Sequence, residues 1–266
     1  MSDHTPSKDK DPFYVGYLPS PRRFAFFMLI LTPILIAVAV ISAIIIAGSQ
    51  QRDPGTGIWD LSQPIEIIGF ADMAPYPVLR VERFDGGLLP IQETVFVVSE
   101  GKIGAADRIA PLQGKEVKAT GFLIERDGMR MLELVGGLDA VQEIPDVRAQ
   151  PPATMPLIEK TPLGSFTLKG QIIDSKCYLG VMKPGEGKPH KSCATMCIIG
   201  GIPPMFMTQN AQGDRAVYLV TDVDGKTAVK SGVTEYIADW IEVTGEIETH
   251  GDIAVFKIDS KTIRRL

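Results

Sequence analysis

The sequence has few cysteines and few histidines, with three of each in 266 residues. An odd number of cysteines cannot be fully paired within one chain, so at least one thiol is left over. Basic residues are also outnumbered, and the formal net charge is -5. Because binding to nucleic-acid phosphates requires a basic face, no nucleic-acid partner is expected.

Charge is absent from one long segment near the start. Residues 24–48 contain no charged side chain, and as a helix they exceed the hydrocarbon thickness of a bilayer, which is about 30 Å. A cleaved signal peptide is the alternative, but its apolar region is normally only about 7–15 residues long. We therefore expect an uncleaved transmembrane helix over 24–48, which contacts the lipid bilayer.

The basic residues beside this segment predict its orientation. Four of them precede it, Lys8, Lys10, Arg22 and Arg23, whereas only Arg52 follows closely. The positive-inside rule then makes residues 1–23 a cytoplasmic tail and places the C-terminal region in the periplasm. The expected location is the bacterial inner membrane, crossed once.

Beyond the apolar segment, short β-rich runs alternate with Gly, Pro and Asp-Gly turns. Two sets of these runs can be aligned with each other, which indicates an internal repeat. The aligned pairs are 65–71 with 166–172, 94–98 with 216–220, and 117–134 with 241–258.

A mostly β fold is therefore expected. A five-strand order with glycine inside the first strand and a long final hairpin is typical of an OB-like barrel. The sequence predicts two tandem small OB-like β-barrels, residues 58–147 and 163–266, joined by a Pro-rich linker over 148–162. A single larger sandwich is the alternative.

The second repeat carries an insertion over residues 174–204. All three cysteines, Cys177, Cys193 and Cys197, lie in it, together with His190. Since the first repeat lacks this segment, we expect the barrels to be scaffold and the insertion to carry the function.

The insertion predicts a converging set of ligands. Pro189 can open a short helix and Gly200 can end it, and Cys177 approaches from the preceding strand. On one face of that helix, at i, i+3 and i+7, lie His190, Cys193 and Cys197. Three thiolates with one imidazole suit a Zn site, and they also suit Cu(I).

Neighbouring polar residues could support these ligands. Asp174 and Glu186 are candidates to orient His190, because metal-bound histidines usually have such a partner. Four lysines surround the cysteines in the sequence and are expected to favour the thiolate form: Lys176, Lys183, Lys188 and Lys191.

Other chemistries remain open or find no support. Outside the cytoplasm, Cys177 could form a disulfide with Cys193 or Cys197, or Cys193 and Cys197 could act as a redox pair. No covalent haem c is expected, because a C-x-x-C-H motif is absent. No nucleotide is expected either, since Gly185-x-Gly187 lacks the required strand–helix context. An enzyme with its own substrate pocket has the least support.

The segment G-x-I-x-D-S-K-C, followed by H-x-x-C-A-x-x-C-I-x-G-G, resembles a group of exported bacterial OB-like β-barrel proteins of uncharacterised activity. The resemblance covers about residues 166–258. This chain departs from the pattern by a longer loop after Cys177 and by Ile202-Pro203-Pro204. The resemblance implies the barrel and the Cys/His signature at Cys177, His190, Cys193 and Cys197, but no activity.

Together these features predict a membrane-anchored extracytoplasmic metal-binding protein. Its expected role is that of a subunit or assembly factor of a respiratory or copper-handling complex, with a membrane or periplasmic protein as partner. A thiol–disulfide redox protein and a structural subunit with a disulfide-pinned loop are the alternatives.

Overall fold

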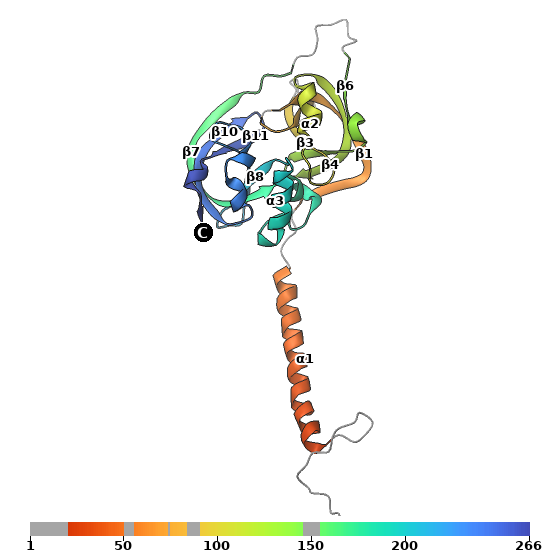
Figure 1. Cartoon of the computed structure of the whole chain (residues 1–266), viewed down its shortest axis with the longest axis vertical. Coiled ribbons are helices and arrows are strands. Elements are labelled where there is room, and N and C mark those ends of the chain that lie inside the picture. The colour runs from red at the N-terminus through yellow and green to blue at the C-terminus, as the bar shows by residue number, and fades with distance from the viewer. Residues whose placement is uncertain (1–20, 51–55, 74, 84–90, 146–154) are drawn as a thin grey trace, which may run out of the picture. The chain divides into compact units, whose positions relative to one another are not determined.

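The N-terminal part of the chain forms one long helix. A computed structural model describes residues 21–50, 56–73, 75–83, 91–145 and 155–266, in two units, 1–53 and 54–266. Helix α1 (Arg22–Gln50) includes Pro33, and its segment Arg22–Gly48 is long and apolar enough to cross a membrane (Figure 1). This finding confirms the predicted apolar helix. Residues 1–20 of the predicted tail lie outside the described residues.

The first β-barrel is built from five strands and one short edge strand. They are β1 (Ile58–Asp72), β2 (Val78–Arg83), β3 (Ile91–Val98), β4 (Glu116–Arg126), β5 (Met129–Leu134) and β6 (Val141–Glu143). The pairing order is β1-β2-β3-β5-β4, and β4 pairs back onto β1, which closes the barrel. Strands β3 and β5 are parallel. The short helix α2 (Ala106–Ile109) lies between β3 and β4.

The second barrel has the same order of pairing. Its strands are β7 (Lys160–Asp174), β8 (Pro204–Gln209), β9 (Arg215–Thr221), β10 (Ile241–His250), β11 (Ile253–Ile258) and β12 (Arg264–Arg265). Strands β9 and β11 form the parallel pair, and β10 closes the barrel on β7. The predicted class, two small OB-like barrels after one apolar helix, is confirmed. Strand β7 begins at Lys160, within the segment predicted as linker.

The register of pairing agrees with most of the alignment between the two barrels. Gly121 pairs with Ile65 in the first barrel, and Gly245 pairs with Phe166 in the second. The third strand is different: Val97 lies in the interior of the first barrel, where Val220, not Leu219, lies in the second. The alignment of 94–98 with 216–220 was therefore wrong by one residue, a slip that exchanges the two faces of a strand.

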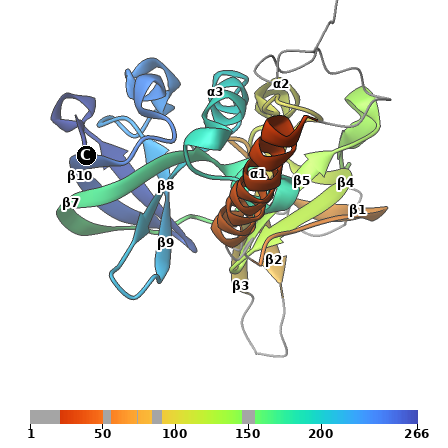
Figure 2. The same ribbon diagram turned by 90° about the horizontal axis from the view of Figure 1, so that it is seen from below.

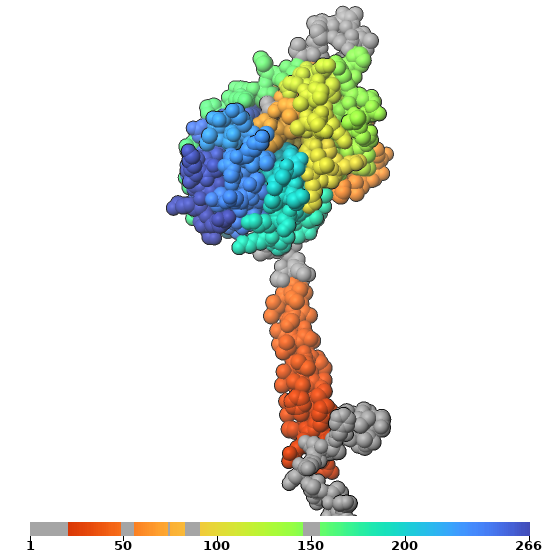
Figure 3. All heavy atoms as spheres, in the orientation of Figure 1, coloured from red at the N-terminus to blue at the C-terminus, as the bar shows by residue number. Residues whose placement is uncertain are grey.

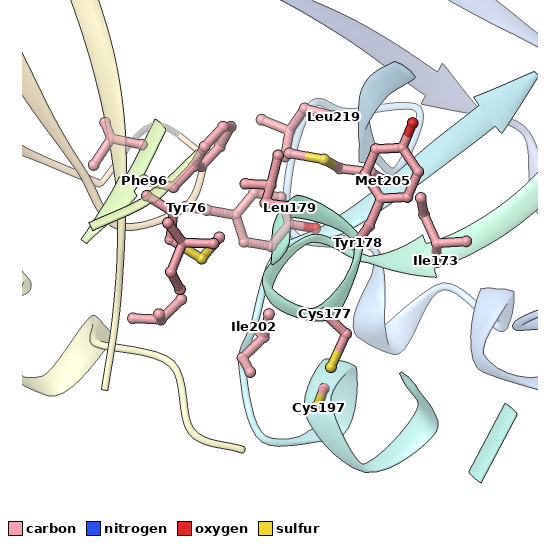
Figure 4. Close-up of a cluster of buried hydrophobic side chains, with 14 of the residues drawn as sticks. Tyr76, Phe96, Ile173, Cys177, Tyr178, Leu179, Cys197, Ile202, Met205 and Leu219 are labelled. Carbon is pink, nitrogen blue, oxygen red and sulfur yellow. The ribbon is translucent and has the colours of Figure 1, made fainter. Parts of the chain in front are cut away.

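Within the described part of the C-terminal unit, three hydrophobic cores stabilise the fold. Each barrel has its own interior, around Val97 and Leu132 in the first and around Val220 and Phe256 in the second. A third cluster, which we call the interface core, joins both barrels; its buried members include Tyr76, Phe96, Ile173, Cys177, Tyr178, Leu179, Cys197, Ile202, Met205 and Leu219 (Figure 4). Burial of so many apolar side chains fixes one barrel against the other.

Candidate metal centre

The insertion begins at Asp174, the last residue of β7. Its Oδ1 atom accepts a hydrogen bond of 2.8 Å from the backbone N–H of Cys177. A carboxylate that accepts from an N–H three residues later caps the start of a helical segment, and the helical residues here begin at Ser175, directly after Asp174. Asp174 is fully buried, so this bond anchors Cys177 firmly to the end of the strand.

The second half of the insertion is helix α3 (Lys191–Ile199), preceded by the turn Lys188–His190. Pro189 lies in that turn and Gly200 follows the helix, so the predicted helix is confirmed. Figure 2 shows α3 between the two barrels.

The structure brings the four predicted ligands together. The Sγ atoms of Cys177 and Cys193 are 3.9 Å apart. Candidate ligand atoms of Cys177, His190 and Cys193 all lie within 4.8 Å of one another, and so do those of Asp174, Cys177 and Cys197. Cys177 belongs to both groups and is the centre of the cluster. Figure 4 shows its sulfur beside that of Cys197. Such a cluster could hold a metal ion.

Most of the cluster is shielded from solvent. Cys177, Cys197 and His190 are buried, whereas Cys193 is partly exposed. A hydrogen bond with Cys197, together with burial, raises the pKa of the Cys177 thiol. The same hydrogen bond lowers the pKa of Cys197. The cluster is therefore most accessible to solvent at Cys193.

The imidazole of His190 has a fixed partner. Its Nε2 atom lies 2.9 Å from Oδ2 of Asp174, and both side chains are buried. Asp174 thus occupies the orienting position expected of it. Glu186, the other predicted partner, instead forms a bidentate ion pair with Arg215, with both distances 2.8 Å.

The lysine beside the thiols is one that sequence reasoning missed. The Nζ atom of Lys102, in the first barrel, donates to Sγ of Cys193 over 3.0 Å, and this bond raises the pKa of Lys102. Lys176 points away to Glu133, and Lys191 pairs with Asp239. These two lysines were expected to favour the thiolate form, and the structure gives each of them a carboxylate partner. No local signal could have identified Lys102, because it lies 91 residues from Cys193 in the chain.

A comparison with protein-family models gives no match, and the comparisons with curated proteins and with solved structures give none either. The resemblance to exported bacterial barrel proteins therefore stays a prediction.

Proposed function

We propose that this chain is a membrane-anchored accessory protein that binds one transition-metal ion through Cys177, His190, Cys193 and Cys197. The spacing of the sulfurs carries the proposal. In a tetrahedral zinc site with Zn–S bonds of about 2.3 Å, neighbouring sulfurs lie roughly 3.8 Å apart. The separation of Cys177 Sγ and Cys193 Sγ is 3.9 Å.

The pairing of His190 with Asp174 also supports a metal site. Histidine ligands commonly give one ring nitrogen to a carboxylate and the other to the metal. With Nε2 of His190 held at 2.9 Å from Asp174, Nδ1 is the nitrogen that remains for a metal. The carboxylate would fix the ring orientation and increase its basicity.

The donor set favours a soft or borderline ion. Three thiolates and one imidazole suit Zn(II) in a closed structural site, and they also suit Cu(I). Cys193 is the partly exposed thiol, so an ion would enter and leave on its side of the cluster.

The anchor and its flanking charges support an extracytoplasmic location. With the basic residues before the span in the cytoplasm, both barrels lie in the periplasm, held at the bacterial inner membrane. We propose a respiratory or copper-handling membrane complex as the partner. The two barrels, taken as copies of one module, would supply the scaffold.

Metal analysis of the full chain in detergent tests this proposal. After incubation with Zn(II) or Cu(I) and desalting, we expect about one ion per chain and protection of the thiols from a thiol reagent. Cys177→Ser should abolish stoichiometric binding. His250→Gln is a control outside the cluster, because His250 also pairs with a carboxylate, Glu248, but is the last residue of strand β10. Absence of metal from the wild-type chain would overturn the proposal.

A thiol–disulfide role is the second candidate, supported by the proximity of Cys177 and Cys193. The structure contains all three cysteines as thiols. This role predicts no bound metal, one reactive thiol in the isolated protein and two more after reduction with dithiothreitol. Thiol counting on the same preparation separates the two proposals.

A further inference from the structure

A loop of the first barrel, Ser99–Gly104, is held by the insertion of the second. The Nζ atom of Lys176 donates to the carbonyl oxygens of Ser99 and Gly101 over 3.1 and 2.7 Å. At the other end of the loop, the N–H of Gly104 donates to the carbonyl of Gly200 over 2.8 Å. The loop is therefore fixed to the segment that carries the cysteines.

The contact between this loop and the end of α3 is close. A Cβ atom added to Gly200 would lie 1.9 Å from the carbonyl oxygen of Lys102, and one added to Gly104 would lie 2.4 Å from that of Gly201. Glycine at these positions lets the two backbones touch. Figure 3 shows the yellow surface of the first barrel directly beside the cyan surface of the insertion.

This contact places the ammonium group of Lys102 on Cys193, with 3.0 Å between Nζ and Sγ. We propose that Lys102 is a positioning residue that sets the metal affinity of the centre, so that the first barrel completes a site whose ligands all lie in the second. The inference rests on the proposed function.

Charge explains why such a residue would matter. Three thiolates give a Zn(II) centre a net charge of −1 and a Cu(I) centre a net charge of −2. A cation that donates to a ligand sulfur offsets part of this charge and strengthens the complex. Lys102 is exposed, so solvent screens the effect, and it should weaken further as salt is added.

Linkage makes the effect reciprocal. If docking of the loop strengthens metal binding, metal binding must strengthen docking of the loop by the same factor. The metal centre would then lock one barrel to the other, through the Ser99–Gly104 loop.

Zinc affinity of the full chain in detergent, measured by competition with a chromophoric chelator, tests the inference. Lys102→Gln should weaken zinc binding about 10-fold, near the lower end of the range for residues that support metal ligands. Lys102→Arg keeps the charge and should restore most of the affinity. The control is Lys115→Gln, on the same barrel, where Lys115 pairs with Glu143 at the surface; it should leave zinc affinity unchanged.

Hydrogen exchange measured with and without zinc separates this role from a purely structural one. If Lys102 were only structural, its substitution would not change the effect of zinc on the exchange rates. Zinc should slow exchange of the Ser99 and Gly104 amides in the wild type, and less so in Lys102→Gln. Equal zinc affinity of wild type and Lys102→Gln, or exchange that zinc does not change, overturns the inference and leaves the proposed function intact. A wild-type chain that takes up no zinc overturns the proposed function itself.

Discussion

The two barrels differ most in the connection between their first two strands. In the first barrel, residues 73–77 join β1 to β2, whereas residues 175–203 join β7 to β8 in the second. The short connection contributes Tyr76, whose hydroxyl donates to Val220 O and accepts from Ala228 N. The long one contributes the cysteines, His190 and α3. The two barrels thus share a strand order, but the β1–β2 connection supplies a hydrogen-bonding contact to the other barrel and the β7–β8 connection supplies the candidate metal ligands.

The largest loss of stability is expected from removing the ion pair between the β7–β8 connection and the first barrel. Lys176 is 2% exposed and pairs with the buried Glu133 over 2.5 Å. In Lys176→Met the carboxylate would stay buried without its cation, which costs about 3–5 kcal/mol. Urea unfolding of the full chain in detergent measures this loss.

Lys115→Met is the matched control for that experiment. Lys115 and Glu143 are both about half exposed, and such surface pairs contribute roughly 0–1 kcal/mol. Equal destabilisation by the two substitutions would show that the pair of Lys176 does not hold the barrels together.

A smaller loss is expected from Gly200→Ala. The added methyl group would overlap the carbonyl of Lys102, and relief of such overpacking costs about 1–3 kcal/mol. The loop should also move away from α3, which speeds exchange of the Gly104 amide. Gly128→Ala is the control, because no atom of the described residues lies within 4 Å of a Cβ added there, so only its positive φ of 82° is strained. An unchanged Gly104 exchange rate would argue against the close contact.

The hydrogen bonds of Tyr76, in the connection between β1 and β2, can be removed with little change in side-chain shape. Tyr76→Phe removes the hydroxyl and leaves Val220 O and Ala228 N buried without this partner, a cost of about 1–3 kcal/mol. Tyr236→Phe, at a ring that lies against Arg265, should cost less. Metal content should not change in either variant, because neither residue is one of the four candidate metal ligands. Loss of metal from Tyr76→Phe would mean that the two connections are not independent.

The smallest effect concerns pH and His250. Burial lowers the pKa of His250 below its ordinary 6.5. Its contribution to stability is therefore complete above pH 6.5 and is lost as the pH falls through the lowered folded-state pKa. In the presence of a chelator, His250→Gln should show a shallower decrease of stability between pH 7.5 and about 5 than the wild type. A steeper decrease would contradict the direction of the shift.

Local signals predicted a good part of this architecture. Three features could be recognised in the sequence: the apolar run over 24–48, the glycine inside the first strand of each barrel, and Pro189 with Gly200 around α3. Each of them constrains only neighbouring residues, so a single sequence is enough to find it. The grouping of His190, Cys193 and Cys197 followed from their helical spacing, whereas Cys177 was expected beside them because it follows the preceding strand.

Contacts between distant segments could not be predicted in this way. Lys176 is next to Cys177 in the chain, yet its side chain turns to Glu133, whereas Lys102 reaches Cys193 from another barrel. Which lysine meets a thiol depends on how the barrels dock, and a single sequence does not show that. Glu186 was likewise expected beside His190 because the two are near in sequence. Its actual partner, Arg215, lies 29 residues away in the chain.

The interface core also has a consequence for dissecting the molecule. Cys177, Tyr178 and Cys197 belong to the same buried cluster as Tyr76 and Phe96 of the first barrel. A fragment that begins at β7 would expose this apolar surface and would aggregate when expressed alone. Proteolytic cleavage between the barrels, by contrast, should yield two pieces that co-elute, so each half behaves as a subunit of a heterodimer that happens to be encoded as one chain.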